Sequence, residues 1–174
     1  MTTIREGRVS WTFGADWLTT KYDDWSIYRN QLNRFAGGSK AVDILALDRP
    51  SGVLWMIEAK DFTTEPRDPA KPELWLEVAQ KVRDTLAGIM ATACVPCDER
   101  ALARTLRDVY KLRVVLHIEQ PTKRSKLFPQ SYDPADLLDK LKKAVRPVDP
   151  HPRVVDATST GLPWTAEWTP GSTT

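Results

Sequence analysis

Two carboxylates and a lysine form the combination of residues in this sequence that is best suited to chemistry. Asp43 precedes the apolar run ILAL, while Glu58 and Lys60 follow the apolar run VLWMI. Burying a carboxylate at the end of an apolar strand costs desolvation free energy unless a cation or hydrogen bonds offset it. Because Mg²⁺ prefers a few carboxylate oxygens together with water and phosphate oxygens, the combination predicts metal-assisted phosphodiester chemistry.

The residues between the two apolar runs predict a tight turn that brings the charged groups together. Pro50 presets the backbone for a turn, and Gly52 permits a positive φ. Counting back from this turn places Asp43 opposite Glu58, and the alternation of side chains then puts Lys60 on the same face. A shift of one residue in this register would move Asp43 to the other face. Both faces of the hairpin are apolar, which is typical of central strands covered on both sides.

The segment GGSKAVDILALDRPSGVLWMIEAKDF resembles the core hairpin of the PD-(D/E)XK nuclease superfamily, which includes restriction endonucleases and Holliday junction resolvases. The resemblance implies that Asp43, Glu58 and the backbone carbonyl of Ala59 bind Mg²⁺ or Mn²⁺. It also implies that Lys60 orients the attacking water or helps to deprotonate it. Val42 stands where the family usually has proline. The implied activity is that of a metal-dependent nuclease hydrolysing phosphodiester bonds, most readily those of DNA.

The same resemblance suggests two weaker site residues. Many members add an acidic ligand from the helix before the hairpin, and Asp24 is the nearest carboxylate, although Asp is also a preferred helix N-cap. Some members place a helical Gln or Lys after E-x-K, where this chain has Gln80 and Lys81. Gln80 is the candidate taken here, and an ordinary solvated helix face is the alternative explanation for both residues.

A basic loop provides the candidate nucleic-acid contacts. Lys123, Arg124 and Lys126 lie close together in a segment bounded by prolines. Contact with phosphates is the functional interpretation, and a solvated surface is the alternative. The formal net charge of the chain is only +2, so any affinity for nucleic acid must come from such local clusters.

A C-x-x-C motif offers competing chemistry. Cys94 and Cys97 could form a thiol redox pair or half of a zinc site. The motif follows a predicted long helix, whereas a redox pair usually opens one. Zinc would require His117 and His151 from distant segments, and a packed imidazole is the simpler expectation for a histidine in mid-strand.

Hydrophobic periodicity and capping residues predict the other elements. We expect helices over residues 25 to 35, 73 to 93, 98 to 110 and 133 to 145. We expect strands over residues 111 to 119 and 153 to 156, and a further edge strand over residues 9 to 13. This order predicts an α/β fold with a restriction-endonuclease-like mixed central sheet flanked by helices on both faces.

Length and composition predict one domain over residues 1 to 156 and an irregular tail over residues 157 to 174, docked through Trp164 and Trp168. No apolar run reaches membrane-spanning length, so a cytoplasmic protein is expected. DNA is the expected partner, and a homodimer or a targeting protein remains open. The alternative function is a nuclease-like domain that has lost catalysis and binds nucleic acid or a protein.

Overall fold

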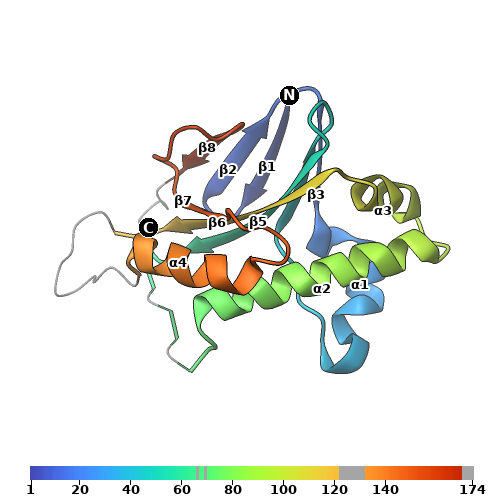
Figure 1. Cartoon of the computed structure of the whole chain (residues 1–174), viewed down its shortest axis with the longest axis horizontal. Coiled ribbons are helices and arrows are strands. Elements are labelled where there is room, and N and C mark those ends of the chain that lie inside the picture. The colour runs from blue at the N-terminus through green and yellow to red at the C-terminus, as the bar shows by residue number, and fades with distance from the viewer. Residues whose placement is uncertain (66, 69, 122–131, 170–174) are drawn as a thin grey trace, which may run out of the picture.

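The computed structural model describes residues 1–65, 67–68, 70–121 and 132–169. The described chain forms two sheets and a set of helices (Figure 1). The larger sheet has five strands in the order β3-β4-β5-β6-β7, and the smaller has three in the order β1-β2-β8. The strands are β1 (Thr2–Glu6), β2 (Val9–Phe13), β3 (Trp17–Lys21), β4 (Ile44–Asp48), β5 (Val53–Asp61), β6 (Lys111–Glu119), β7 (Arg153–Val155) and β8 (Thr165–Trp168). The helices are η1 (Tyr22–Asp24), α1 (Ser26–Asn30), η2 (Leu32–Gly37), α2 (Leu74–Cys94), α3 (Arg100–Arg107) and α4 (Pro134–Val145).

The five-stranded sheet is mixed, because β3, β4 and β5 pair antiparallel while β5, β6 and β7 pair parallel. The parallel pairs need crossover connections, which α2 and α3 provide between β5 and β6, and α4 between β6 and β7. The α/β class predicted from the sequence is confirmed. Within the described residues, no helix is long and apolar enough to cross a membrane.

The central hairpin has the predicted register. Asp48 pairs with Val53 across the turn, and the ladder continues to Ile44 opposite Ile57. Gly52 has a φ of 64°, as the turn requires. The ladder ends at Ile44, so the expected pairing of Asp43 with Glu58 is not part of it.

The chain just before β4 turns toward α2. The backbone N–H of Val42 donates to Thr85 Oγ1 at 3.0 Å, and that of Lys40 donates to Asp84 Oδ2 at 3.0 Å. Thr85 is fully buried, so its hydroxyl can satisfy a backbone group that the sheet leaves unpaired. These bonds fix the position of Asp43 between the sheet and α2.

The two faces of the five-stranded sheet are covered differently, which corrects the expectation of helices on both faces. One face packs against α1, α2, α3 and α4 around side chains such as Leu45, Met56 and Val82. The other face packs against the small sheet, whose Trp11 and Phe13 are fully buried. Figure 1 shows α2 and α4 on one side of the large sheet and β1 and β2 on the other. The N-terminal aromatic residues therefore form a second layer, because their alternating pattern buries every other residue of β2.

Several elements differ from the sequence prediction. The continuous helix expected over residues 25 to 35 is broken into α1 and η2. The strand expected at an edge, β2, lies in the middle of the small sheet. The tail expected to be irregular includes β8, which pairs with β2, and Trp164 is only 6% exposed. The tail pairs with strands near the N-terminus, a distant contact that local composition does not encode.

Gly88 in the middle of α2 marks the closest packing between this helix and the η1 segment. A Cβ at Gly88 would lie 1.8 Å from Tyr22 Oη, and Tyr22 is fully buried. We expect Gly88→Ala to lower the free energy of unfolding by about 1–3 kcal/mol, because a buried ring must shift. Urea denaturation followed by circular dichroism measures this change.

The matched control is the double variant Gly88→Ala with Tyr22→Phe. Tyr22 Oη has no hydrogen-bond partner among the described residues, so its removal alone should cost little. The double variant should recover part of the lost stability. Equal losses in the single and the double variant would show that the clash with the hydroxyl is not the cause.

Candidate functional site

The structure brings Asp43, Glu58 and Lys60 together beside the last residues of β5. Asp43 Oδ2 accepts a hydrogen bond of 2.7 Å from the backbone N–H of Ala59. The Lys60 ammonium donates to Glu58 Oε1. The Asp43 carboxylate is therefore held against β5 by a side-chain bond in place of the strand pairing that was expected.

Lys81 of α2 completes this cluster, and it is the residue that sequence reasoning missed. Its Nζ lies 2.5 Å from Glu58 Oε1 and 3.5 Å from Asp43 Oδ1. A tethered ammonium thus lies between the two carboxylates. We name Asp43, Glu58, Lys60 and Lys81 the carboxylate–lysine cluster.

Burial dominates the electrostatics of the cluster. Glu58 is fully buried, and this burial, reinforced by the charge of Asp43, raises its pKa to about 7 against the opposing effect of Lys60 and Lys81. Burial also favours the neutral form of Lys81, yet the carboxylates of Glu58 and Asp43 raise the pKa of Lys81 above its ordinary value. Both pKa shifts indicate that Lys81 is protonated and carries its positive charge at neutral pH.

A second layer of charges ties the loop after β5 to α2. Lys60 Nζ lies 3.7 Å from Glu77 Oε1, and the Arg67 guanidinium donates to the Glu77 carboxylate. Burial alone would raise the pKa of Glu77, but the hydrogen bond from Arg67 and the nearby Lys60 outweigh it and lower that pKa. The described part of the loop therefore borders the cluster.

The cluster has oxygen atoms that could hold a divalent cation. Within the part of the chain that the structure describes, Glu58 Oε2 is buried without a hydrogen-bond partner, and the contact found for Asp43 Oδ1 is the one with Lys81 at 3.5 Å. No group of three or more His, Cys, Asp or Glu side chains suited to a metal occurs in the described ranges. Mg²⁺ needs only one or two carboxylates when water and phosphate complete its shell, so these residues fit it better than they fit zinc.

The weaker site residues lie elsewhere. Asp24 is exposed and borders a groove with Thr3 and Lys21, and it caps neither η1 nor α1. Gln80 lines a groove between α2 and α4, where Val145 also lies. Lys123, Arg124 and Lys126 fall outside the described residues.

The cysteines and histidines do not come together in the described chain. Cys94 and Cys97 are free thiols near the end of α2. His117 is fully buried in β6, where its Nε2 lies 2.7 Å from Glu119 Oε1 and its ring meets Trp11 edge-on at 5.2 Å. This packed imidazole is the arrangement expected for a histidine in mid-strand.

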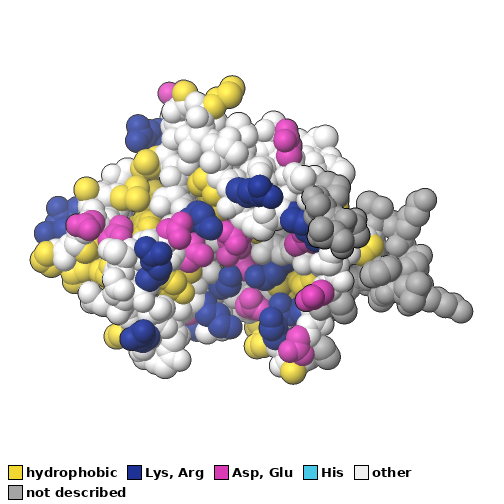
Figure 2. Space-filling view, turned by 180° about the vertical axis from the view of Figure 1, so that it is seen from behind, with side chains coloured by type: hydrophobic (Ala, Val, Ile, Leu, Met, Phe, Trp, Pro, Cys, Tyr) yellow, Lys and Arg dark blue, Asp and Glu magenta, His cyan; other side chains and the backbone are white. Residues whose placement is uncertain are grey.

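One face of the molecule carries charges of both signs. Figure 2 shows Asp and Glu side chains near the middle of one face with Lys and Arg side chains around and between them. Interleaved charges leave little net field to attract a polyanion. Binding of nucleic acid on this face would therefore require a bridging cation or specific contacts.

Comparison with known proteins gives one informative relative. The chain is 36% identical, over an alignment of 174 residues, to a cysteine-tRNA ligase of Neisseria meningitidis, and the match covers 82% of this chain and 25% of the relative. The chain thus spans about a quarter of the length of the curated relative it matches. No family model and no solved structure matches the chain.

This comparison overturns the interpretation as a PD-(D/E)XK nuclease. The relative is named a ligase, so nuclease function and hydrolase class, both predicted from residues 43 to 60, are wrong. The convergence of Asp43, Glu58 and Lys60 was predicted correctly in space, but their chemistry was not. A charged group at the end of an apolar hairpin is compatible with several functions, because fold and local motif do not determine activity.

Proposed function

We propose that this chain is a tRNA-contacting domain of a protein related to cysteine-tRNA ligase. The observation that carries the proposal is the match to that ligase over 82% of this chain. The chain spans only a quarter of the relative, and the part of that activity which we propose for it is the holding of tRNA and not the ligation step.

The carboxylate–lysine cluster is the proposed point of contact with a tRNA phosphate. Asp43 and Glu58 would repel a phosphate directly. Bound Mg²⁺ supplies positive charge and open coordination positions for phosphate oxygens. Glu58 Oε2 and Asp43 Oδ1 would hold the ion, and the Ala59 carbonyl is the third ligand proposed. Lys60, whose side chain is 21% exposed, reaches the surface and would donate to a neighbouring phosphate oxygen.

The same relative supports the partner and the cellular location that we propose. DNA was the partner expected from the sequence, and the name of the relative makes tRNA the better proposal. A cytoplasmic location is part of this proposal. A restriction-endonuclease-like arrangement of the sheet, a homodimer and a targeting protein stay predictions on which the proposal does not depend.

Asp43→Asn tests the proposal by the direction of its effect. With a bridging metal, the loss of one ligand charge should weaken the binding of a fluorescently labelled cysteine tRNA by about tenfold. Without a metal, the same change removes a charge that repels phosphate, so binding should become tighter. Fluorescence anisotropy of the tRNA titrated with protein measures the difference.

The control is Asp139→Asn, which removes an exposed carboxylate of α4 that is paired with Lys143 at 2.6 Å. This variant should bind tRNA like the wild type. Mg²⁺ also folds tRNA, so the variants are compared in one buffer. Unchanged or tighter binding by Asp43→Asn would contradict the metal bridge, and the absence of tRNA binding by the wild type would contradict the proposed function.

A further inference from the structure

A hollow of about 290 Å³ lies where η2 runs beside α2, apart from the carboxylate–lysine cluster. Its walls are mostly apolar, with small residues along α2 and one aromatic side chain from η2. A space of this size is near the lower end of ligand pockets, so it suits one ring system and not a whole cofactor. The lining residues used below are Leu32, Phe35, Arg83, Asp84, Ala87 and Gly88.

The backbone beside the hollow is in an unusual conformation. Ala36 has a φ of 50°, followed by 87° at Gly37 and 114° at Gly38. A left-handed alanine costs free energy that glycine avoids, and such strain persists where the surrounding structure imposes it. Next to this turn, Phe35 is left 69% exposed. The ring of Phe35 is therefore accessible to a ligand that enters the hollow.

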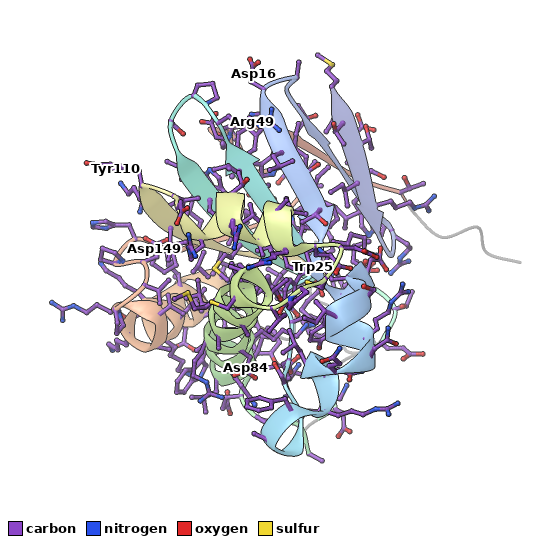
Figure 3. All side chains as sticks on the ribbon, turned by 90° about the vertical axis from the view of Figure 1, so that its right-hand side faces the viewer. Asp16, Trp25, Arg49, Asp84, Tyr110 and Asp149 are labelled. Atoms are coloured by element: carbon purple, nitrogen blue, oxygen red, sulfur yellow. The ribbon has the colours of Figure 1, made fainter. Side chains whose placement is uncertain are left out.

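Polar groups also line the hollow. The Asp84 carboxylate accepts a hydrogen bond from the backbone N–H of Lys40 and pairs with Arg83 at 2.8 Å. The Arg83 side chain is 74% exposed, so the N–H groups of its guanidinium that do not bind Asp84 can donate to a ligand. Figure 3 shows Asp84 on α2 next to the η2 segment. The hollow therefore combines ring faces with donors and acceptors at its rim.

Helix α2 contributes residues to both the hollow and the carboxylate–lysine cluster. Lys81 belongs to the cluster and Gly88 to the hollow, and seven residues of helix separate them by roughly 10 Å. The segment that ends at Asp43 also runs along α2 between the two, through the bond from Val42 to Thr85. A polymer that binds the cluster with one of its units can therefore place a neighbouring unit in the hollow.

We propose that this hollow binds one unstacked nucleobase of the tRNA whose phosphate lies at the carboxylate–lysine cluster. This inference rests on the proposed function. A base has a flat apolar face for Phe35 and Leu32 and a polar edge for Asp84 and Arg83. Proteins that read single-stranded RNA use this combination of aromatic stacking and edge contacts.

The probe is a short single-stranded RNA, compared with an abasic strand of the same length that keeps the ribose and phosphate. The wild type should bind the strand with bases about tenfold more tightly, within the range known for base stacking on aromatic residues. Phe35→Ala should lose this preference and keep its affinity for the abasic strand, whereas Phe35→Trp should retain the preference. Ala87→Trp, which fills the hollow from its exposed side, should act like Phe35→Ala.

The outcomes separate this inference from the proposed function. If the wild type binds tRNA and Phe35→Ala keeps the preference for bases, the nucleobase site is overturned and the proposed function stands. If the wild type binds neither strand nor tRNA, both are overturned. If both strands bind equally and Phe35→Ala instead changes self-association in sedimentation, the occupant is a second copy of this chain and the nucleobase site is again overturned.

Discussion

Asp149→Ala is expected to lower the free energy of unfolding by about 3–5 kcal/mol, the range found when one partner of a buried ion pair is removed. Asp149 is fully buried. Its carboxylate accepts hydrogen bonds from Arg113 Nη1 at 2.8 Å, from the backbone N–H of Val114 at 2.9 Å and from that of His151 at 2.9 Å. The change would leave the partly exposed guanidinium of Arg113 and the buried N–H of Val114 without this acceptor, and a buried unpaired donor adds a desolvation cost. The loss should exceed that caused by Gly88→Ala.

Chemical denaturation of Asp149→Ala and of Asp139→Ala provides the comparison. Asp139 is exposed and its pair with Lys143 lies in water, so this control should unfold like the wild type. Asp149→Asn should fall between the wild type and Asp149→Ala, because it keeps an oxygen acceptor but loses the charge. Equal midpoints for Asp149→Ala and Asp139→Ala would show that the network around Asp149 contributes nothing to stability.

Lys81→Met is expected to increase the affinity for Mn²⁺ by at least about tenfold. The Lys81 ammonium lies between Glu58 and Asp43, at 2.5 Å and 3.5 Å from their oxygens, and so occupies the region that a cation would use. A bound metal must displace this ammonium or share the carboxylates with it. Methionine keeps a flexible apolar side chain for packing and removes the charge.

Isothermal titration calorimetry with Mn²⁺ measures this effect without any assay of function. Lys142→Met, at an exposed position on α4, is the control and should leave metal binding unchanged. Circular dichroism of Lys81→Met verifies that the fold survives the loss of the ion pair. Weaker Mn²⁺ binding in a folded Lys81→Met would mean that the lysine does not compete with a metal at these carboxylates.

The sequence predicted local features of the site better than distant ones. The turn at Pro50 and Gly52 is encoded by adjacent residues, so the register from Asp48 to Ile44 could be predicted. Asp43 was placed on the right side of the sheet, but the bond from the Ala59 N–H that holds it there could not be foreseen.

Lys81 was considered together with Gln80, yet only the rotation of α2 in the structure shows that it, and not Gln80, faces the carboxylates. The covering of the second sheet face was missed for a related reason. β2 pairs with β8 across more than 150 residues of sequence, and short strands such as Thr165–Trp168 give a weak local signal. The residues of the small sheet therefore resembled an edge strand and an irregular tail.

Function was the least predictable property. The residues that suggested hydrolysis form a real cluster, but charge and geometry alone do not specify what a cluster acts on. Comparison over most of the chain gave a different indication, which is a similarity to a cysteine-tRNA ligase of which the chain spans about a quarter.

The central claim is tested most directly by incubating the protein in Mg²⁺ with three labelled probes of equal length. The probes are a cysteine tRNA, a tRNA for another amino acid and a DNA hairpin, each resolved on a native gel and then on a denaturing gel. We predict that the cysteine tRNA is shifted at the lowest protein concentration and runs at full length on the denaturing gel. Preferred binding of the DNA hairpin, or shortening of any probe that Asp43→Asn prevents, would contradict the proposal that this chain contacts tRNA.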